Sequence, residues 1–390
     1  MPRSLRLVVA PDSFGGALDS VGVAEAIAVG WERARPLDSI VRVPMADGGE
    51  GTLAAVAAAL GSLATRHTLA TTDALGRPVL ADWLLLDDGR TAFVEMATAS
   101  GLALLAPAER TPASALSAST RGTGDLLRAA LDAGVARVIL GIGGSATTDG
   151  GSGALAALGV RFVDDGGAEL PGGGAALARL ALIDASGLDA RLADTELIVA
   201  SDVTNLLTGP AGAAATYGPQ KGADPDVVAD LDAALAIYGA AIAAATGRDV
   251  AEMPGSGAAG GMAAGLLGFS GAVLRPGFEV VAEMVGLPAA LAEADLVVTG
   301  EGRADEQTLA GKAAMGVAQL AHVAGIPVAL VCGALGPGAE VLDAAGLFEL
   351  VQPIPDRPID LADAMADTER LVTNAAERLA RTVGLGQQLA

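Results

Sequence analysis

The stretch from Gly141 to Gly153 constrains the fold more than any other part of the sequence. It reads Gly-Ile-Gly-Gly-Ser-Ala-Thr-Thr-Asp-Gly-Gly-Ser-Gly, follows the short apolar run 138–140, and leads into an Ala/Leu-rich helical pattern at 154–158. This order predicts a strand, a glycine-rich turn and the start of a helix. Backbone N–H groups and the positive end of a helix dipole then point to one place, which suits an anion such as phosphate. A tight turn without a ligand is the alternative.

Apolar runs typical of buried strands alternate with helical patterns near both ends of the chain. Such alternation predicts a mainly parallel sheet with helices on its faces. The predicted strands and helices of these parts are, in chain order, strand 5–10, a helix from Ser20, strand 40–43, helix 52–60, strand 296–299, helix 312–324, strands 328–332 and 348–351, and helix 361–383.

The middle of the chain has a different pattern. Consecutive strand patterns at 64–69, 79–86 and 91–96 are joined by hairpin-like turns, which introduces antiparallel pairing. At 390 residues the chain can form two domains of ordinary size. We therefore predict an α/β fold with two α/β domains and a ligand cleft between them. A discontinuous Rossmann-like parallel-sheet domain comprises residues 1–62 plus 288–390, and an inserted mixed-sheet α/β domain comprises residues 63–287.

Charge and cysteine content exclude several classes of protein. The formal net charge of −22 argues against nucleic acid and anionic membranes as partners. A single cysteine, Cys332, excludes an internal disulfide framework and fits a reducing compartment. The apolar run 7–10 is too short for a signal peptide, and the uncharged span 254–274 is too rich in glycine and alanine for a membrane helix. These observations predict a cytoplasmic protein that binds neither nucleic acid nor a membrane.

Several loops that follow predicted strands carry acidic or small polar side chains beside glycine. In an open α/β sheet the ligand lies beyond the carboxyl ends of the strands. Carboxylates there can hold Mg²⁺ together with substrate phosphates, and cations can neutralise a transferring phosphoryl group. Of the 24 basic residues only Lys221 and Lys312 are lysines, and both lie in glycine-flanked turns. The loops are 12–13, 47–50, 141–153, 201–205 and 301–305.

Two other kinds of site compete with phosphoryl transfer. Gly141-x-Gly143-x-x-Ala146 matches the dinucleotide fingerprint, with Asp164 at the place of a ribose-binding acid, which would indicate an NAD-dependent enzyme. With 53 glycines in the chain such matches also arise by chance. His67, His322 and Cys332 have no spaced partners for a metal cluster or a catalytic triad, and neither lysine ends a Walker phosphate loop.

Taken in order, these motifs resemble the bacterial glycerate kinase type-1 family over essentially the whole chain. The motifs that carry the resemblance are Ala10-Pro11-Asp12-Ser13-Phe14, residues 44–52, Gly143-Gly144-Ser145-Ala146-Thr147 with Asp149-Gly150-Gly151, residues 201–205, 218–223, 257–261 and 299–303, and Gly311-Lys312. The resemblance implies phosphorylation of D-glycerate with ATP and Mg²⁺, and it favours 2-phosphoglycerate over 3-phosphoglycerate as the product. It leaves the oligomeric state open, with a homo-oligomer as one alternative.

The resemblance and the loops together predict a role for each polar residue. The catalytic candidates are Asp202 and Asp47, as general base, and Lys221, Lys312 and Arg303, which would stabilise phosphate charge. The candidates for ATP binding are Gly143, Gly144, Ser145, Thr147, Thr148, Glu301 and Gly302. The candidates for substrate binding are Asp12, Ser13, Gly48, Gly49, Glu50 and Asn205. The candidate metal ligands are Asp149, Asp202 and Glu301.

The chain departs from the family pattern at four positions. Gly15 stands where the family usually has lysine, and Thr148 where it has asparagine; Leu206 and Ala314 replace prolines. Loss of a cation at Gly15 leaves two alternatives open besides glycerate phosphorylation. The chain is a kinase for another small hydroxy acid, or it binds a nucleotide or carboxylate with little turnover.

Overall fold

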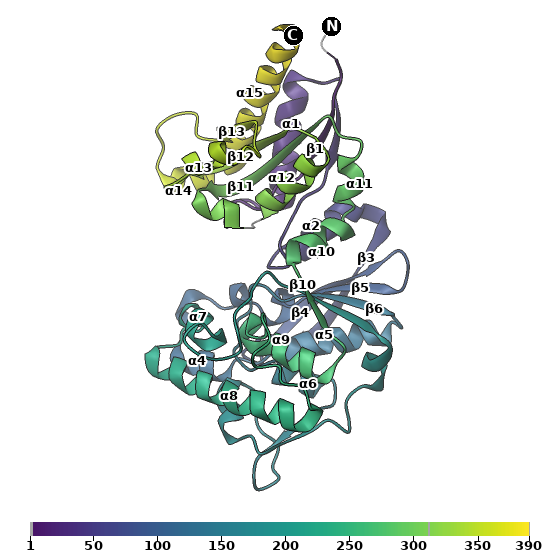
Figure 1. The fold of residues 1–390 in the computed structure, drawn as a ribbon, viewed down its shortest axis with the longest axis vertical. Coiled ribbons are helices and arrows are strands. Elements are labelled where there is room, and N and C mark those ends of the chain that lie inside the picture. The colour runs from purple at the N-terminus through teal and green to yellow at the C-terminus, as the bar shows by residue number, and fades with distance from the viewer. Residues whose placement is uncertain (1–2, 311–312, 390) are drawn as a thin grey trace. The chain divides into compact units, whose positions relative to one another are not determined.

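The computed structural model describes residues 3–310 and 313–389, which fall into two compact units (Figure 1). Unit 1 comprises Met1–Asp47, Ala54–Gly61 and Phe278–Ala390, and unit 2 comprises Gly48–Leu53 and Ser62–Gly277. Both units combine a sheet with helices, so the predicted α/β fold class is confirmed. Short 3-10 helices join several elements: η1 (Gly61–Leu63), η2 (Leu102–Leu104), η3 (Pro107–Glu109), η4 (Gly174–Arg179), η5 (Ala190–Asp194), η6 (Pro219–Lys221) and η7 (Glu306–Ala310).

The sheet of unit 1 has five parallel strands in the order β13-β12-β11-β1-β2. Its strands are β1 (Arg6–Val9), β2 (Ser39–Arg42), β11 (Leu296–Ala304), β12 (Val328–Leu335) and β13 (Leu350–Pro353). The helices within it or at its boundary are α1 (Ser20–Ala34), α2 (Thr52–Leu60), α10 (Gly277–Met284), α11 (Leu287–Leu291), α12 (Ala313–Val323), α13 (Glu340–Ala345), α14 (Leu361–Ala366) and α15 (Thr368–Leu389).

Helices α1 and α15 lie side by side and pack on one face of this sheet (Figure 1). Trp31 of α1 and Leu371 of α15 are fully buried in the core that these helices form with β1 and β11. A Cβ at Gly30 would lie 2.1 Å from the carbonyl oxygen of Thr373, so only glycine permits this approach of the two helices.

Two elements of unit 1 differ from the sequence prediction. Strand β11 continues to Ala304 and pairs there with Leu335 of β12, whereas the prediction ends this strand at Thr299. The last helix is divided at Asp367 into α14 and α15, whereas the apolar period predicts one helix over 361–383. The period continues through the break, so periodicity alone does not reveal it.

The sheet of unit 2 has six strands in the order β10-β9-β6-β5-β4-β3. It is mixed: β4 pairs antiparallel with both β3 and β5, whereas the neighbours among β5, β6, β9 and β10 pair parallel. Its strands are β3 (Ala64–Thr72), β4 (Pro78–Leu86), β5 (Thr91–Glu95), β6 (Arg137–Gly141), β9 (Glu196–Ala200) and β10 (Val273–Arg275). Strands β7 (Arg161–Val163) and β8 (Leu182–Asp184) form a separate antiparallel pair. Its helices are α3 (Ala97–Ser100), α4 (Pro112–Ser117), α5 (Arg121–Asp132), α6 (Ser152–Ala157), α7 (Ala213–Tyr217), α8 (Pro225–Thr246) and α9 (Ala258–Phe269).

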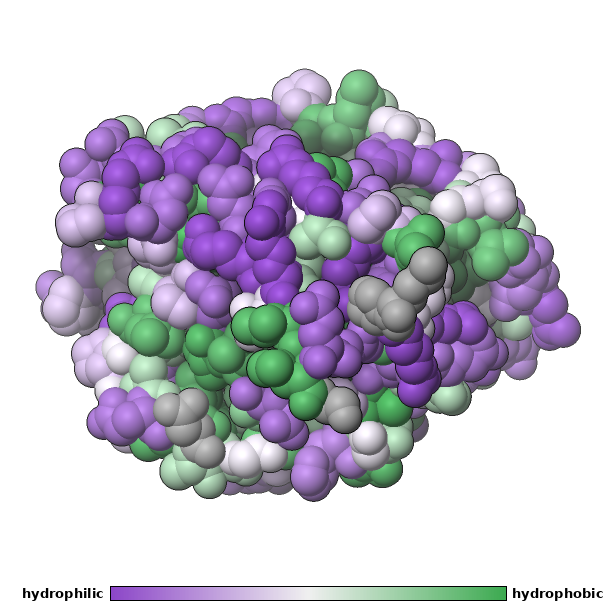
Figure 2. Space-filling model, turned by 90° about the horizontal axis from the view of Figure 1, so that it is seen from above, coloured by the Kyte–Doolittle hydropathy of each residue, from purple (hydrophilic) through white to green (hydrophobic). Residues whose placement is uncertain are grey.

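Among the described residues, α8 alone is long and apolar enough to cross a membrane by length and composition. One of its faces, with Leu231, Leu235, Tyr238 and Ile242, is fully buried in unit 2. Packing therefore accounts for the apolar character of this helix. Hydrophilic residues cover most of the face shown in Figure 2, and hydrophobic residues gather in a smaller group on it.

The register of the parallel strands places four residues in one row at the carboxyl edge of the unit 2 sheet. Glu95 pairs with Gly141, Gly141 with Ala200, and Ala200 with Arg275, and each is the last residue of its strand. The glycine-rich stretch and the loop 201–205 therefore leave the sheet at the same edge. This is the edge at which α/β proteins bind ligands.

Candidate functional site

In unit 1 the candidate residues gather where the strand order reverses. From β1 the chain proceeds to β2 on one side, whereas β11, β12 and β13 lie on the other side of β1. Asp12 follows β1, Asp47 follows β2 and Glu301 lies in β11, all toward the carboxyl ends of these strands. A switch point of this kind opens a crevice for a ligand. The two predicted loops and the end of β11 thus form one candidate site edge in unit 1.

Three carboxylates influence one another at this edge. Burial raises the pKa of Asp12 to about 6, and repulsion from Asp47 and Glu301 adds to this effect. The Ser13 N–H, which donates to Asp12 Oδ1 over 2.6 Å, acts in the opposite direction. A cation or a hydrogen-bond donor on a ligand would relieve this repulsion, so the edge suits a hydroxylated ligand or a metal-bound one.

Glu301 and Arg303 are oriented by their neighbours. Glu301 is 5% exposed, and its Oε1 accepts a hydrogen bond of 2.6 Å from the Thr308 hydroxyl. The side chain of Arg303 is 59% exposed, and its Nε lies 3.0 Å from Asp305 Oδ2. Arg303 is thus a cation at the surface beside the buried Glu301. Lys312, the other predicted cation of this part of the chain, lies outside the described residues.

Gly15 lies beside this edge in a conformation that favours glycine. Its φ is +45°, and no heavy atom lies within 4 Å of the place a Cβ would occupy. A side chain at this position would enter open space but would strain the backbone. Gly302 is half-exposed, and a Cβ added to it would lie 3.2 Å from backbone atoms of Phe14 and Gly15, so glycine permits the close approach of these two segments.

In unit 2, the buried side chain of Lys221 forms hydrogen bonds with the glycine-rich stretch. It is 2% exposed, and its Nζ donates to Ser145 Oγ over 3.0 Å and to the Thr147 carbonyl oxygen over 2.5 Å. Burial lowers the pKa of Lys221 to about 7, against the opposing effect of Asp149. The ammonium group is therefore directed into the protein. In this arrangement it supports Ser145, rather than contacting phosphate as the sequence predicts.

Asp149 organises the same stretch and does not present its carboxylate as a metal ligand would. It is fully buried and accepts hydrogen bonds from the N–H groups of Thr120, Gly151 and Gly153 and from the Thr120 hydroxyl, over 2.8–3.2 Å. Burial raises the pKa of Asp149 although these hydrogen bonds oppose the rise. Both oxygens are used within the protein, so the prediction that Asp149 faces the metal is not supported.

Two of the predicted ATP-binding hydroxyls are also buried. Thr147 is 0% and Thr148 is 1% exposed, and neither hydroxyl has a hydrogen-bond partner in the described part of the chain. A ligand outside the stretch does not reach them in this arrangement. Gly143 is half-exposed, Gly144 is exposed with φ of +70°, and Ser145 is 8% exposed. These three remain the candidates for contact with an anion.

The loop after β9 carries two candidate residues, Asp202 and Asn205, whose side chains lie in different surroundings. Asp202 is exposed, and its Oδ1 accepts a hydrogen bond of 2.9 Å from the Gly277 N–H at the end of unit 2. Asn205 accepts from the Tyr217 hydroxyl over 2.9 Å and donates to the Ala211 carbonyl oxygen over 2.7 Å. Asp202 therefore lies at the surface of unit 2 with one oxygen held by the Gly277 N–H, whereas the amide of Asn205 holds the segment between residues 205 and 217 in place.

Glu95 supports a segment of the candidate site and is not among the residues that the sequence singles out. It is 3% exposed and accepts hydrogen bonds from the N–H groups of Gly51 and Leu53, over 3.1 and 2.6 Å. It therefore anchors the segment that carries the predicted substrate residues Gly48, Gly49 and Glu50. Of these three, Gly48 is buried against Ala200, and Glu50 is exposed. The only sequence signal was a lone acidic residue that ends an apolar strand pattern.

Substitution of Glu95 is expected to change how stability depends on pH. Burial raises the pKa of Glu95 to about 7, from 4.5, so the folded protein binds the proton more tightly than the unfolded chain. The contribution of Glu95 to stability therefore falls as pH rises from about 4.5 to 7. In Glu95→Gln this part of the pH dependence is absent, because glutamine does not titrate.

Thermal unfolding of the wild type and of Glu95→Gln between pH 4.5 and 8 measures this difference. Glu252→Gln, at an exposed position of the same unit, is the matched control and should follow the wild type. Parallel pH curves for the wild type and Glu95→Gln would show that the titration of Glu95 does not matter to stability.

The described residues contain no group of three or more His, Cys, Asp or Glu side chains arranged to hold a metal ion. Of the three predicted metal ligands, Asp149 uses both oxygens in hydrogen bonds within the glycine-rich stretch and its surroundings. Asp202 and Glu301 therefore remain as candidates. Magnesium binds proteins through one or two carboxylates together with substrate phosphates, so a single carboxylate in either unit is compatible with this ion.

The structure argues against the dinucleotide alternative. Asp164 follows β7, which belongs to the separate pair β7–β8 and not to the main sheet that contains β6. Its Oδ1 accepts hydrogen bonds from the N–H groups of Gly166 and Ala168 within a tight turn. A ribose-binding acid would instead follow a strand of the main sheet.

The fold and the polar strand ends define an α/β protein with polar loops at the carboxyl edges of its sheets, the edges at which α/β proteins bind ligands. Residues 7–384 match the model of the glycerate kinase family. The chain is 41% identical to a glycerate kinase of Bacillus subtilis over 385 residues, covering 99% of both chains. It is 42% identical to the glycerate 2-kinase of Escherichia coli over 387 residues, covering 98% of this chain and 99% of that protein.

A solved structure agrees with these sequence comparisons. It is a crystal structure of a Salmonella typhimurium LT2 protein provisionally named glycerate kinase 2, with a TM-score of 0.86 and 44% identity. The match covers 99% of this chain and all of that chain. The chain belongs to the glycerate kinase family, and it is an enzyme of the kinase class.

Proposed function

We propose that this enzyme transfers the γ-phosphoryl group of ATP to a hydroxyl of D-glycerate, with 2-phosphoglycerate as the product. The observation that supports this most is the order of the polar loops at the sheet edges, in a chain that matches glycerate kinases over residues 7–384. The name of the Escherichia coli relative, glycerate 2-kinase, favours the 2-hydroxyl over the 3-hydroxyl. The proposed partners are small molecules, glycerate and ATP, and the proposed compartment is the cytoplasm.

In the proposed reaction the glycerate hydroxyl oxygen forms a bond to the γ-phosphorus as the bond to the ADP oxygen breaks. The hydroxyl proton passes to a carboxylate, for which the exposed Asp202 is the first candidate and Asp47 the second. The carboxylate takes the proton late, because positioning and electrostatics provide most of the catalysis of phosphoryl transfer. Arg303 supplies a surface cation to the developing phosphate charge.

The remaining polar residues bind and orient. Gly143, Gly144 and Ser145 offer backbone N–H groups and a hydroxyl to phosphate, with Ser145 held by Lys221. Asp12 and Ser13 bind the hydroxyl groups of glycerate. Mg²⁺, held by Asp202 or Glu301, would neutralise charge on the phosphates of ATP.

Consumption of ATP with D-glycerate, by the full chain in the presence of Mg²⁺, tests this proposal. Formation of the 2-phospho product, identified by ³¹P NMR, is the expected result. Formation of 3-phosphoglycerate would support the proposed kinase activity but show that the phosphoryl group is transferred to the 3-hydroxyl instead of the 2-hydroxyl. Folded protein that shows no turnover above background would contradict the proposal.

Gly15 motivates a second candidate function, a kinase for another small hydroxy acid. The position lacks the cation that the family usually places there, and the open space beside it leaves room for a different substrate group. The two candidate functions can be distinguished by comparing the initial rate with D-glycerate to the initial rates with glycolate, D-lactate and L-glycerate. A clear preference for D-glycerate dismisses this second candidate, and binding of ATP without any product would indicate a binding protein instead.

Introduction of the missing cation is expected to raise the rate. In Gly15→Lys the new side chain enters open space after the loop that carries Asp12 and Ser13, so kcat/KM for D-glycerate should rise by about tenfold if a cation there binds the substrate carboxylate. The φ of +45° disfavours any side chain, so Gly15→Asn, which tolerates this conformation, is the matched control without charge. Equal rates for the two variants would show that the cation is not needed.

A further inference from the structure

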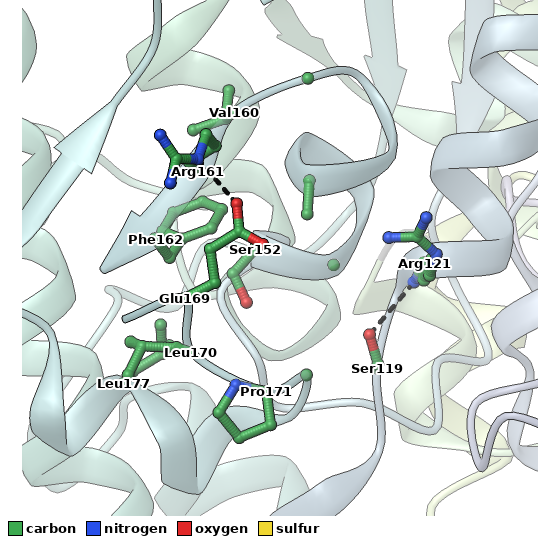
Figure 3. Close-up of a pocket in the computed structure, with 14 residues that line it drawn as sticks. Ser119, Arg121, Ser152, Val160, Arg161, Phe162, Glu169, Leu170, Pro171 and Leu177 are labelled. Atoms are coloured by element: carbon green, nitrogen blue, oxygen red, sulfur yellow. Dashed lines mark hydrogen bonds and ion pairs between the residues drawn. The ribbon is translucent and has the colours of Figure 1, made fainter. Parts of the chain in front are cut away.

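Unit 2 contains a cavity of about 370 Å³ that none of the candidate catalytic or substrate residues lines (Figure 3). Its walls come from the start of α5, the start of α6, strand β7 and the segment 169–172. All of these lie within one unit. The cavity is therefore a feature of unit 2 by itself.

One buried polar side chain is directed into the cavity without a partner. Ser152 is 6% exposed, and its hydroxyl makes no hydrogen bond to any described residue. Its oxygen still touches solvent, and in Figure 3 it lies among the lining residues Glu169, Leu170 and Pro171. A buried hydroxyl normally has a hydrogen-bond partner, so this one is available to a ligand.

An unpaired cation lies at another wall of the cavity. Arg121 is the first residue of α5, its side chain is exposed, and among the described residues no carboxylate pairs with its guanidinium group. Ser119, which also lines the cavity, accepts the Arg121 N–H over 3.3 Å. The start of a helix adds partial positive charge at the same place. In a chain with net charge −22, such a group favours a negatively charged ligand.

The opposite wall of the cavity is apolar. Phe162 and Leu177 are 6% and 2% exposed, and Leu170 and Pro171 complete this wall. At its edge Arg161 pairs with Glu169 over 2.7 Å, so that glutamate is already neutralised and does not oppose an anion strongly. The walls thus combine one free cation, one free hydroxyl and a compact apolar surface.

We propose that this cavity binds a small organic carboxylate with a compact apolar body. The carboxylate contacts Arg121, the hydroxyl of Ser152 donates to it or to a polar substituent, and the apolar body packs against Phe162 and Leu177. The size of the cavity and its mixed walls suit such a ligand better than an inorganic anion or a neutral hydrocarbon.

Occupancy of the cavity is coupled to the glycine-rich stretch, and this part of the inference rests on the proposed function. Ser152 and Gly153 of the cavity belong to that stretch, and Asp149 joins Gly153 to Thr120, the residue before Arg121. A ligand that orders these residues shifts the conformational equilibrium of the stretch that carries Ser145. We expect it to act as an effector of the kinase.

Binding of benzoate to the full chain without other ligands tests the proposal. Two further probes each lack one feature of benzoate: inorganic phosphate has no apolar ring, and benzyl alcohol has no negative charge. Titration calorimetry and ligand-observed NMR should show that benzoate binds more tightly than either of the other probes. Arg121→Gln should weaken benzoate binding about tenfold or more, and Ser152→Ala should weaken it severalfold. Arg90→Gln, at another exposed arginine of unit 2 outside the cavity, is the matched control and should leave binding unchanged.

Three results would overturn the proposal. These are an absence of benzoate binding at millimolar concentration, equal binding by Arg121→Gln and Arg90→Gln, and strictly competitive displacement of benzoate by D-glycerate, in which the apparent Kd of benzoate rises in proportion to D-glycerate without a plateau, as for a shared site. Because binding is measured without turnover, these results do not depend on whether the enzyme phosphorylates glycerate. If benzoate binds but changes neither kcat nor KM, the coupling to the glycine-rich stretch is wrong.

Discussion

Replacement of Lys221 by methionine is expected to lower kcat/KM by about a hundredfold or more and to destabilise unit 2. Methionine fills a similar volume, so the fold is retained, but Ser145 Oγ and the Thr147 carbonyl oxygen lose their shared donor. An unsatisfied buried polar group costs about 1–3 kcal/mol. Ser145 and the residues around it then lose the fixed position that phosphate binding requires.

The variant also has a distinct pH signature. Burial lowers the pKa of Lys221 to about 7 from 10.5, so between these values the unfolded chain binds the proton that the folded protein releases. The contribution of Lys221 to stability therefore rises as pH increases from about 7 to 10.5. Thermal unfolding of the wild type at pH 7–10 should show this rise, and Lys221→Met should lack it.

Comparison with Ser145→Ala separates a positioning role from direct contact with phosphate. If Lys221 acts through Ser145, the double variant Ser145→Ala/Lys221→Met should be little worse than either single variant. Effects that multiply would show that Lys221 contacts the substrate by itself, as the sequence predicts, and that the glycine-rich stretch rearranges when ligands bind. Lys221→Arg is expected to fail as a rescue, because the planar guanidinium is larger than the buried ammonium site.

Lys221 also illustrates what could be predicted from the sequence. Its place in a glycine-flanked turn was visible, and so was the order of strand, glycine-rich turn and helix at 137–157. The direction of its side chain was not visible in the sequence, because glycine patterns specify backbone angles but not which side of a turn is buried. For this reason Thr147, Thr148 and Asp149 could be assigned to the stretch while their burial could not be foreseen.

The strand ends of both sheets were predictable because polar residues directly follow apolar runs. Asp12, Asp47 and Asp202 all lie where this rule places them. The rule fails at β11, where Gly300 and Gly302 resemble a turn but continue the strand. A Cβ at Gly300 would lie 3.2 Å from the ring of Phe14, so glycine serves close packing there. Glu95 was missed because its partners, Gly51 and Leu53, are more than forty positions away.

Replacement of Asp202 by asparagine is expected to lower kcat by about 10²- to 10⁴-fold, the range associated with loss of a general base. Asparagine retains an oxygen that accepts the Gly277 N–H, now 2.9 Å from Asp202 Oδ1, so the loop after β9 should keep its position. Thermal unfolding should therefore remain close to that of the wild type. Asp165→Asn, at another exposed aspartate of unit 2, is the matched control for the loss of one charge and should leave kcat unchanged.

Two further measurements separate the roles proposed for Asp202. If it is the base, kcat falls at saturating Mg²⁺, and the concentration of Mg²⁺ that gives half-maximal rate stays the same. If it is a metal ligand, that concentration rises and additional Mg²⁺ restores part of the rate, because a lost ligand weakens binding more than chemistry. Asp47→Asn tests the alternative base in the same way. A larger fall in kcat for Asp47→Asn than for Asp202→Asn would move the base to unit 1, where burial, together with repulsion from Asp47 and Glu301, raises the pKa of Asp12.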